Sequence, residues 1–477
     1  MQETLSAELA AIVGPDAVLD RREDLMLYEY DGSVDRALPQ AVVFPASTAE
    51  VLALVRWANE HKLPIVARGA GTGLSGGAVA AKGGLVVGFS RLKKILEIDI
   101  PNQRAVVQPG VVNLDLSQAM QSSGYYYAPD PSSQKACTIG GNVAENSGGP
   151  HTLAYGVTTN HVLGLEVVLP EGEVIHTGGK VFDCPGYDLT GLLVGSEGTL
   201  GIVTQIIVRL TRRPEAVKTL LAIFESVDDA SETVAEITAR AITPAALELM
   251  DQLALQAVET ATRAGYPMDA AAVLLVELEG LIEGVEAQAE QIREVCRKCR
   301  ARDVRVAQSE RERQLLWAGR KNAFGAMGRL APSYYVQDGV IPRTRIGETL
   351  RFIREVSDRT GLKIANVFHA GDGNLHPVIL FDARDKEQYR QVIQAGAEIL
   401  KFCVSIGGSL TGEHGIGMEK NELMPLLFTE DDLTVMGRIK AVFNPDGRLN
   451  PAKVFPTTKG CGEIRIPPQA GAIAGAM

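Results

Sequence analysis

Residues 68–77 read Arg-Gly-Ala-Gly-Thr-Gly-Leu-Ser-Gly-Gly, and this glycine-rich stretch is the clearest sign of architecture in the first half of the chain. From Gly71 onward it satisfies the G-x-G-x-x-G dinucleotide fingerprint, which in a Rossmann fold requires a helix directly after the loop. A glycine pair at 83–84 leaves no room for that helix. The stretch therefore predicts a loop between two strands, with backbone N–H groups that form a nest for an anion. For this segment alone, a glycine turn without a ligand is the alternative.

Two further loops of the same kind favour a ligand. Residues 138–149 (Thr-Ile-Gly-Gly-Asn-Val-Ala-Glu-Asn-Ser-Gly-Gly) combine small residues with amide side chains that can hydrogen-bond a flat heterocycle. Residues 195–203 turn directly into a strand. Glycine permits a positive φ and a close approach of the backbone to phosphate. One long, extended ligand lying across several strand ends would explain all three loops.

The order of the elements indicates an α+β chain with more than one domain, because 477 residues are too many for one core. Residues 1–213 are predicted to form a nucleotide-binding domain. Its expected elements are a helix at 48–62 and strands at 64–67, 84–89, 95–100, 104–108, 162–169, 173–177 and 202–210.

Composition changes near residue 213, and residues 214–406 are predicted to form a second, substrate-binding (cap) domain. It is expected to be an α/β sandwich in which helices cover one face of an antiparallel sheet. The expected strands are 217–224, 272–278 and 376–381, and the expected helices are 228–240, 247–264, 283–300, 345–360 and 385–406. Residues 407–456, with a helix at 430–443, are predicted to return to the first domain, and 457–477 to be a disordered tail.

Charge and cysteine usage narrow the class of protein. The net charge of -11 makes nucleic acid an improbable partner, although a local Arg or metal ion still permits a small anionic substrate. The six cysteines are scattered, which predicts a reducing compartment. The lone C-x-x-C at 296–299 is interpreted as ordinary helix surface. Without a signal peptide or a long apolar run, the chain is expected to be cytoplasmic and to reach a membrane only through partners.

Three of the seven histidines lie in two glycine-rich turns. One turn reads Asn-Val-Phe-His369-Ala-Gly-Asp-Gly-Asn-Leu-His376-Pro, and about forty residues later comes Gly-Glu413-His414-Gly-Ile-Gly. Imidazole with carboxylate is a ligand set for a divalent metal, and an additional His beside a ligand is the usual layout for a base. For any single His, a hydrogen-bonded structural role is the alternative. Four such groups in glycine-flanked turns favour a metal site.

These motifs resemble a known group of flavoproteins. The loops at 67–77, 129–149 and 195–203 resemble the FAD-binding domain of the vanillyl-alcohol oxidase / p-cresol methylhydroxylase (PCMH) superfamily. The segments 315–323, 365–374 and 407–417 are similar to those of the FAD-binding catalytic subunits of bacterial glycolate oxidases, relatives of D-lactate and D-2-hydroxyglutarate dehydrogenases. The resemblance runs from about residue 20 to residue 456.

The resemblance implies a PCMH-type FAD-binding domain and identifies the residues that would hold the cofactor. They are Arg68, Gly69, Ala70, Gly71, Thr72, Gly73, Asp130, Thr138, Gly141, Asn142, Glu145, Asn146, Gly148, Glu197, Gly201, Ile202 and Asn450. Some members of the superfamily attach FAD covalently through a His in the first loop. This chain has Thr72 there and no His between residues 62 and 150, so FAD is expected to bind non-covalently.

The resemblance also implies the chemistry. Related dehydrogenases place a divalent metal on residues matching His369, His376 and Glu413, and zinc, manganese or iron would suit these ligands. The implied reaction is oxidation of a 2-hydroxy acid, in which the metal chelates the acid, His414 removes the hydroxyl proton and hydride passes to flavin N5. Arg320 matches a substrate arginine in related enzymes and would pair with the substrate carboxylate.

The expected substrate is small. Phe324 and Val336 stand where hydroxyglutarate enzymes need polar or basic groups for a second carboxylate. An apolar lining leaves that carboxylate unpaired, which is costly. We therefore expect glycolate or D-lactate.

Partners are implied as well. In the family, separate iron–sulfur and second flavin-binding subunits carry electrons to membrane quinone, and this chain lacks the Cys spacing of an iron–sulfur cluster. One alternative is a stand-alone D-lactate dehydrogenase. Another is a non-catalytic flavoprotein subunit, which would lack the His/Glu set. A third is a metal-dependent hydrolase that uses the first domain only to bind a nucleotide.

Overall fold

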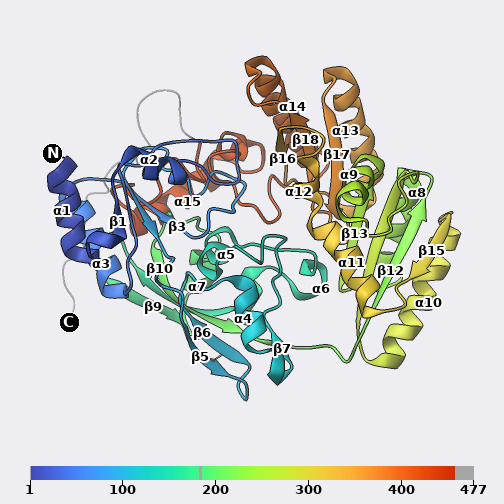
Figure 1. The fold of residues 1–477 in the computed structure, drawn as a ribbon, viewed down its shortest axis with the longest axis horizontal. Helices are drawn as coiled ribbons and strands as arrows, with labels where there is room; N and C mark the ends of the chain where they lie inside the picture. Colours follow the sequence, from blue (N-terminus) through green and yellow to red (C-terminus); the bar gives the residue numbers. More distant parts are fainter. Residues whose placement is uncertain (1, 182–184, 457–477) are drawn as a thin grey trace.

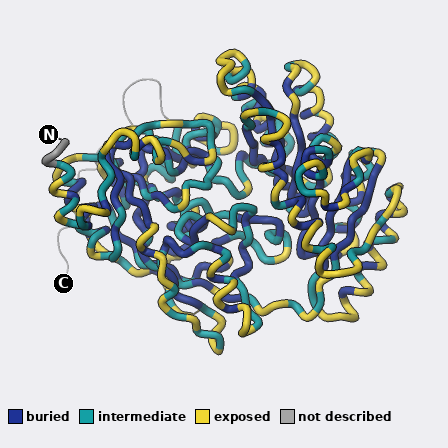
Figure 2. The backbone as a smooth tube through the Cα atoms, viewed as in Figure 1, coloured by how far each residue is buried: buried dark blue, intermediate teal, exposed yellow. Residues whose placement is uncertain are grey.

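The structure is a computed structural model that describes residues 2–181 and 185–456. Figure 1 shows two halves: the blue-to-green segments and the red C-terminal segment form one, and the light-green-to-brown segments form the other. Buried strands run through the interior of each half, dark blue in Figure 2. The predicted disordered tail, 457–477, lies outside the described residues. Within the described ranges, every helix is too short or too polar to cross a membrane.

The first half begins with a four-stranded sheet in the order β1-β2-β4-β3. Its strands are β1 (Val18–Leu19), β2 (Ala41–Val43), β3 (Ile65–Arg68) and β4 (Leu85–Gly88), and α1 (Gln2–Val13) and α3 (Thr48–Glu60) share its core. β3 and β4 pair in parallel, and the chain between them, residues 69–84, contains turns and bends but no helix. The prediction of a loop between strands, rather than a Rossmann turn, is confirmed.

An antiparallel sheet completes the first half, in the order β5-β6-β10-β8-β9. The strands are β5 (Ile95–Asp99), β6 (Arg104–Val107), β8 (Val162–Val168), β9 (Val174–Gly178) and β10 (Ile202–Arg209). Short helices pack on it: α4 (Asn113–Ala119), α5 (Ile139–Glu145) and α7 (Leu189–Leu193). β7 (Tyr125–Tyr126) and β11 (Thr211–Arg212) pair beside this sheet, and α6 (Thr152–Tyr155) follows α5.

The second half is built on a seven-stranded antiparallel sheet in the order β15-β12-β14-β13-β17-β18-β16. The strands are β12 (Ala216–Phe224), β13 (Ala246–Asp251), β14 (Ala272–Gly280), β15 (Asp303–Val306), β16 (Ser333–Val336), β17 (Lys363–His369) and β18 (Pro377–Phe381). One face packs on α8 (Val227–Ala239), α10 (Ile282–Lys298), α13 (Ile346–Thr360) and α14 (Lys386–Ser405).

The other face of this sheet packs on α9 (Gln252–Thr262), α11 (Glu310–Lys321) and α12 (Ala323–Met327). The prediction that helices cover only one face is therefore wrong. Alternate residues of β12 belong to two separate cores, with Leu220 on one side and Leu221 on the other. A strand buried on both faces has a nearly continuous apolar sequence, which hides its alternation.

The same effect explains the wrong prediction of one helix over 247–264. The segment begins as the buried central strand β13 and becomes a helix only at α9. Asp251 marks the change, because its side chain caps α9 by accepting a hydrogen bond from Ala254 N at 2.9 Å. The C-x-x-C pair was also misplaced, since Cys296 and Cys299 are buried against the sheet rather than on a helix surface.

The last described segment packs against the first half. After α14 the chain passes through residues 407–429 to α15 (Glu430–Phe443), drawn in red in Figure 1. Leu449 forms a parallel bridge with Ile65 of β3, and Met418 N donates to Ser75 O at 2.9 Å. This return brings residues 413–418 beside the glycine-rich loop that follows β3.

Candidate active site

One cavity joins the glycine-rich loops of the first half to the His/Glu cluster. Phe324, Glu413 and His414 line it together with residues 67–74. The predicted cofactor residues in its wall are Arg68, Gly69, Ala70, Gly71, Thr72, Gly73, Thr138, Gly141, Asn142, Glu145, Glu197, Gly201 and Asn450. Residues from distant parts of the sequence therefore share one space.

Glycines let the backbone itself form the wall of this cavity. A β-carbon on Gly69 would lie 2.4 Å from Thr138 Oγ1, and one on Gly77 would lie 2.4 Å from Glu145 Oε1. Gly71 has a φ of +69°, in the left-handed region that disfavours other residues. The first and second loops can approach each other this closely only without side chains at Gly69 and Gly77.

The polar groups of the cavity fit a large heterocyclic cofactor such as FAD. Asn450 Nδ2 donates to Gly77 O (2.9 Å) and to Glu197 O (2.6 Å), while its buried Oδ1 has no partner. Glu145 Oε2 is also buried and unpartnered. Because buried polar atoms are almost always hydrogen-bonded, these two oxygens indicate partners supplied by a bound molecule.

Four predicted cofactor residues lie outside the cavity wall. Asn146 ends α5 with a φ of +53°, and Ile202 is buried in the core beside β3. Gly148 packs against a predicted metal ligand, since a β-carbon there would lie 3.0 Å from Glu413 Oε2. The fourth, Asp130, belongs to an ion cluster described below.

The three predicted metal ligands come together at the end of a β-hairpin. His369 is the last residue of β17 and His376 directly precedes β18, so the hairpin returns both rings to one place. His369 Nε2 lies 3.2 Å and His376 Nε2 lies 3.3 Å from Glu413 Oε1. All three ligand atoms lie within 4.8 Å of one another.

The chemistry of this donor set fits a divalent cation. His376 is 1% exposed, yet neither of its ring nitrogens makes a hydrogen bond. Burial would raise the pKa of Glu413, but His369 and His376 lower it to about 2, so the group is a carboxylate. Two imidazoles and one carboxylate suit zinc, manganese or iron.

A buried ion pair between Glu248 and Arg320 contacts His369 on the side of the ring that faces away from Glu413. Glu248 of β13 is fully buried, and both of its carboxylate oxygens lie 2.9 Å from His369 Nδ1. Arg320 of α11, predicted to bind the substrate, places Nη2 2.5 Å from Glu248 Oε2 and does not line the cavity. Burial would raise the pKa of Glu248, but Arg320 and His369 lower it. Glu248 therefore orients the His369 ring so that Nε2 faces Glu413.

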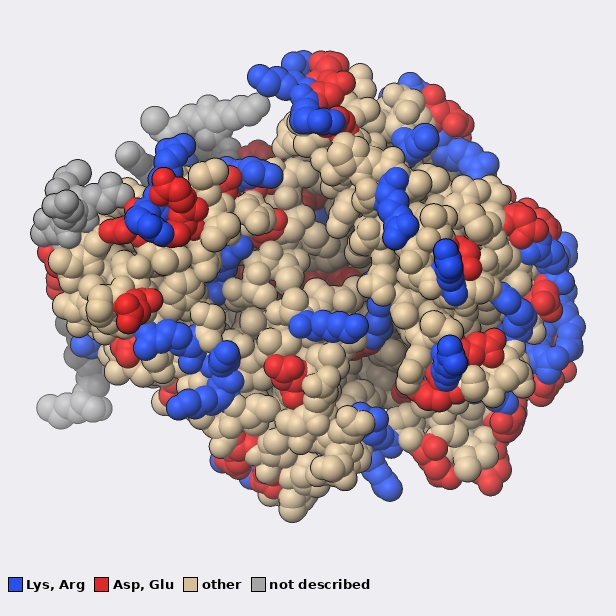
Figure 3. Space-filling model, in the orientation of Figure 1, with Lys and Arg blue, Asp and Glu red and all other residues tan. Residues whose placement is uncertain are grey.

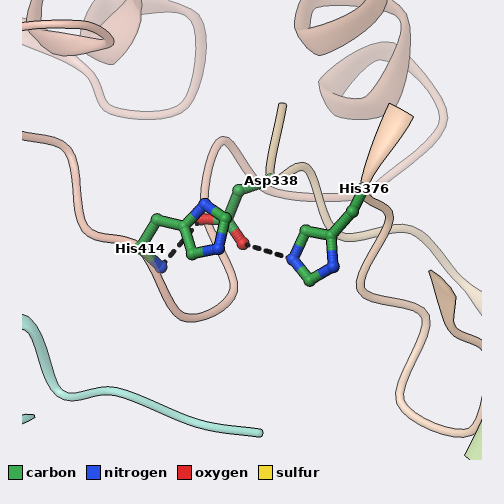
Figure 4. Close-up of side chains that lie close together, drawn as sticks. All are labelled: Asp338, His376 and His414. Atoms are coloured by element: carbon green, nitrogen blue, oxygen red, sulfur yellow. Dashed lines mark hydrogen bonds and ion pairs between the residues drawn. The ribbon is translucent and has the colours of Figure 1, made fainter. Parts of the chain in front are cut away.

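Asp338 organises the turn that carries Glu413 and His414, and Figure 4 shows its contacts with His414 and His376. This fully buried carboxylate accepts hydrogen bonds from the backbone N–H groups of Glu413 (3.2 Å) and His414 (3.0 Å). Lys420 Nζ lies 3.1 Å away, and His376 Nε2 lies 3.7 Å away. Removing Asp338 would release the turn from the hairpin.

His414 lines the cavity and stacks on His376, with ring centroids 4.9 Å apart. Burial lowers the pKa of His414 to about 4, although Asp338 opposes this shift. The ring is therefore neutral near pH 7, and its buried Nδ1 has no hydrogen-bond partner. It meets the requirements for a proton acceptor beside the metal ligands.

Sequence reasoning missed Glu248 and Asp338. The available signal was a single carboxylate inside an apolar run, Ala-Leu-Glu248-Leu-Met and Tyr-Val-Gln-Asp338-Gly-Val. A charged residue in a buried segment needs a partner, so each carboxylate indicates a site.

The two residues expected to line the substrate site lie in different places. Phe324 lines the cavity, and its ring meets that of His376 edge-on with centroids 5.7 Å apart, whereas Val336 is buried in the core.

A second His/carboxylate group, which we name the seam cluster, joins the two halves. It consists of His151, Glu277 and Glu279, whose ligand atoms also lie within 4.8 Å of one another. Asp130 accepts hydrogen bonds from His151 Nδ1 and Lys321 Nζ, both at 2.9 Å. Burial would lower the pKa of His151, but Asp130 and Glu277 raise it to about 10.

Comparison with known families identifies both halves. Residues 39–178 match the family described as "FAD binding domain", and residues 213–454 match "FAD linked oxidases, C-terminal domain". Solved structures agree on the fold. The crystal structure of p-cresol methylhydroxylase with substrate bound has a TM-score of 0.80 at 20% identity, covering 95% of this chain and 96% of that one. The chain thus has the fold of the PCMH-type flavoproteins, as predicted.

Curated relatives narrow the group. The glycolate oxidase subunit GlcD of Escherichia coli strain K12 is 47% identical over 94% of this chain and 90% of that protein. GlcD of Bacillus subtilis strain 168 is 44% identical over 94% and 96%. A D-lactate dehydrogenase of Archaeoglobus fulgidus is 34% identical over 90% and 95%. The chain belongs to the FAD-linked oxidase family and, within it, to the group of the glycolate oxidase subunit GlcD, so the predicted resemblance is confirmed.

Proposed function

We propose that this protein oxidises a small 2-hydroxy acid, with glycolate as the expected substrate, to the 2-oxo acid, and that non-covalently bound FAD receives the electrons. The observation that carries the proposal is the shared cavity, in which Glu413 and His414 line the same space as the glycine-rich loop 67–74. The identity of 44–47% with two GlcD subunits supports glycolate as the substrate.

The proposed roles follow from position and protonation state. When bound, FAD supplies a hydride acceptor, and a divalent ion supplies a Lewis acid that lowers the pKa of the substrate hydroxyl. His369, His376 and Glu413 would hold zinc, manganese or iron. Neutral His414 accepts the hydroxyl proton. Asp338 holds the backbone of His414 in place while it does so.

Arg320 is the proposed partner of the substrate carboxylate. Its Nη2 pairs with Glu248 and its buried Nε has no hydrogen-bond partner, so N–H groups remain for a carboxylate, which would have to reach past the present cavity wall because Arg320 does not line the cavity. Phe324 sets the size limit, because its ring stands in the cavity beside His376. A second carboxylate next to this ring would lose its hydration without gaining a partner.

The test is anaerobic mixing of the holoenzyme with glycolate, D-lactate, L-lactate and D-2-hydroxyglutarate, monitored by bleaching of the visible flavin absorbance. We expect glycolate to bleach the flavin fastest and D-2-hydroxyglutarate slowest. Bleaching by none of these acids would refute the proposed function. Equal bleaching rates with glycolate and D-2-hydroxyglutarate would refute the size limit at Phe324 but not the proposed oxidation of a 2-hydroxy acid.

A second candidate is a stand-alone D-lactate dehydrogenase, which the 34% identity with such an enzyme favours. We propose instead that electrons leave through separate iron–sulfur and second flavin-binding subunits, and that these hold the protein at the cytoplasmic side of the inner membrane. The word "subunit" in the name of the GlcD relatives supports this arrangement. Rapid reduction of a quinone analogue by this chain alone would favour the stand-alone enzyme.

We further propose that the chain divides functionally at residues 213 and 406. Residues 1–213 would hold FAD, residues 214–406 would supply the metal hairpin and Arg320, and residues 407–456 would complete the site. Limited proteolysis of the holoenzyme at the 213 junction, followed by separation of the fragments, would test the first boundary.

A further inference from the structure

A second pocket, the seam pocket, opens between the two halves beside the flavin cavity. Its wall includes Ser132, Gln134 and Lys135 of the first half and one face of α11 from the second. Ser132 lines both the seam pocket and the flavin cavity. Asn322, also in the pocket wall, stands two residues before Phe324 of the flavin cavity. The two spaces therefore adjoin at the part of the cavity that contains Phe324.

The wall of the seam pocket is basic although the whole chain is acidic. Lys135, Arg313 and Lys321 line it together with His151, against one carboxylate, Glu277. The chain as a whole carries a net charge of -11. Figure 3 shows the hollow between the two halves with Lys and Arg side chains along its border.

The carboxylates at the base of the pocket are already neutralised inside the protein. Glu277 accepts hydrogen bonds from Trp317 Nε1 and Thr219 Oγ1, both at 2.5 Å, and lies 3.3 Å from His151 Nε2. The nearby Asp130 is paired with His151 and Lys321. These groups lie under the pocket and contribute little negative potential to its mouth.

Lys135 differs from the other basic residues of the wall. It is exposed and forms no ion pair with any residue in the described ranges. An unpaired ammonium at the mouth of a pocket with low-dielectric walls raises the local concentration of small anions. The substrate of the proposed reaction is such an anion.

We propose that the seam pocket is the access route by which small monocarboxylate anions reach the flavin cavity, and that Lys135 collects them at its mouth. This inference rests on the proposed function, because that function makes the substrate a carboxylate. It explains how a strongly acidic protein receives an anionic substrate. Repulsion by the net charge is overcome locally, at the one seam where the two halves meet beside the active site.

The first test reverses the charge of Lys135 in the holoenzyme. Lys135→Glu is expected to lower kcat/KM for glycolate about fivefold at low ionic strength with kcat little changed, and the loss should shrink below about twofold at roughly 0.5 M salt. The matched control is Lys93→Glu, an exposed lysine in the same half that lines neither cavity. An equal loss in both variants, or a loss that salt does not relieve, would overturn the proposal.

The second test does not depend on turnover. Trp317 lines the seam pocket, and the chain has only two tryptophans, so tryptophan fluorescence reports on anions in the pocket. At constant low ionic strength, quenching of the holoenzyme by iodide should fall about twofold in Lys135→Glu and remain unchanged in Lys93→Glu. Quenching by neutral acrylamide should be the same in all three proteins.

The two tests separate the two ideas. If no hydroxy acid bleaches the flavin but Lys135→Glu still reduces iodide quenching, the proposed function fails and the anion-collecting pocket stands. If glycolate bleaches the flavin but iodide quenching and salt dependence do not respond to Lys135→Glu, the pocket proposal fails and the function stands.

Discussion

Two clusters in the described part of the chain can be compared, because each combines histidine with carboxylates and each contributes to the wall of a cavity: Glu413 lines the flavin cavity, and His151 and Glu277 line the seam pocket. The metal-ligand cluster contains His369, His376 and Glu413, and the seam cluster contains His151 and two glutamates. In each, the possible ligand atoms lie within 4.8 Å of one another. Residue types and spacing therefore do not distinguish the two.

The state of the polar atoms does distinguish them. In the seam cluster, Glu277 accepts hydrogen bonds from Trp317 and Thr219, and Glu279 accepts one from Tyr155 at 2.6 Å. In the metal-ligand cluster, both ring nitrogens of the buried His376 lack hydrogen bonds. A cluster whose nitrogen and oxygen atoms already have hydrogen-bond partners in the protein stabilises the contact between the two halves. Buried ring nitrogens without hydrogen-bond partners, beside a carboxylate that lines a cavity, indicate a bound ion.

The largest expected effect comes from removing one ligand of the metal-ligand cluster. His376→Ala should lose the bound metal and slow flavin bleaching by glycolate at least about 10⁴-fold, because the Lewis acid contributes several kcal/mol. His151→Asn is the matched variant of the seam cluster and should keep its metal. Elemental analysis and stopped-flow absorbance provide the readouts. Equal metal loss from both variants would contradict the distinction.

Removal of the base should have the next largest effect. His414→Ala is expected to slow bleaching about 10²- to 10³-fold while FAD and metal remain bound, since only proton acceptance is lost. Absorbance spectra and elemental analysis check retention. His176→Ala, at an exposed histidine of β9, is the control and should bleach at the wild-type rate. A wild-type rate in His414→Ala would exclude this residue as the base.

A smaller effect should follow from changing the carboxylate behind His369. Glu248→Gln is expected to weaken metal affinity about 10- to 100-fold, because such partners orient a ligating imidazole. Competition with a chromogenic chelator measures the affinity. Glu279→Gln, the matched change in the seam cluster, should leave it unaltered. Unchanged affinity in Glu248→Gln would remove the proposed positioning role.

The smallest expected effect is on stability and belongs to the seam cluster. The pKa of His151 is raised from 6.5 to about 10 in the folded state, against burial, by Asp130 and Glu277. The stabilisation of the folded state by protonated His151 is therefore complete below about pH 6.5 and is lost as the pH rises through 10. His151→Asn should be less stable by about 3 kcal/mol near pH 7, with the difference shrinking toward pH 10. Urea unfolding at several pH values measures it, and a difference that is constant with pH would contradict the assignment.

Much of the fold could be predicted because its signals are local. The glycine pair at 83–84 excluded a Rossmann helix, and helix 48–62 was recognised from its cap and apolar stripe. Strand β13 and the helices on both faces of the large sheet were not predicted. A strand buried on both sides has no alternation to distinguish it from a helix.

The site was predictable in part for a related reason. Histidine and glutamate in glycine-rich turns are an unusual local pattern, which pointed to His369, His376 and Glu413. The structure brings these three residues together. Glu248 and Asp338 act through contacts with residues far away in sequence, such as Glu248 with His369. No local pattern encodes such a pairing, and only the sheet order places β13 beside β17.

The central claim is that a metal held by the hairpin histidines and Glu413 works in the same cavity as the flavin. The most direct test is to remove the metal from the holoenzyme with a chelator, confirm its loss by elemental analysis, and mix the protein anaerobically with glycolate. The account predicts that FAD stays bound, that bleaching stops, and that added zinc or manganese restores it. Bleaching at the full rate by verified metal-free protein would contradict the account.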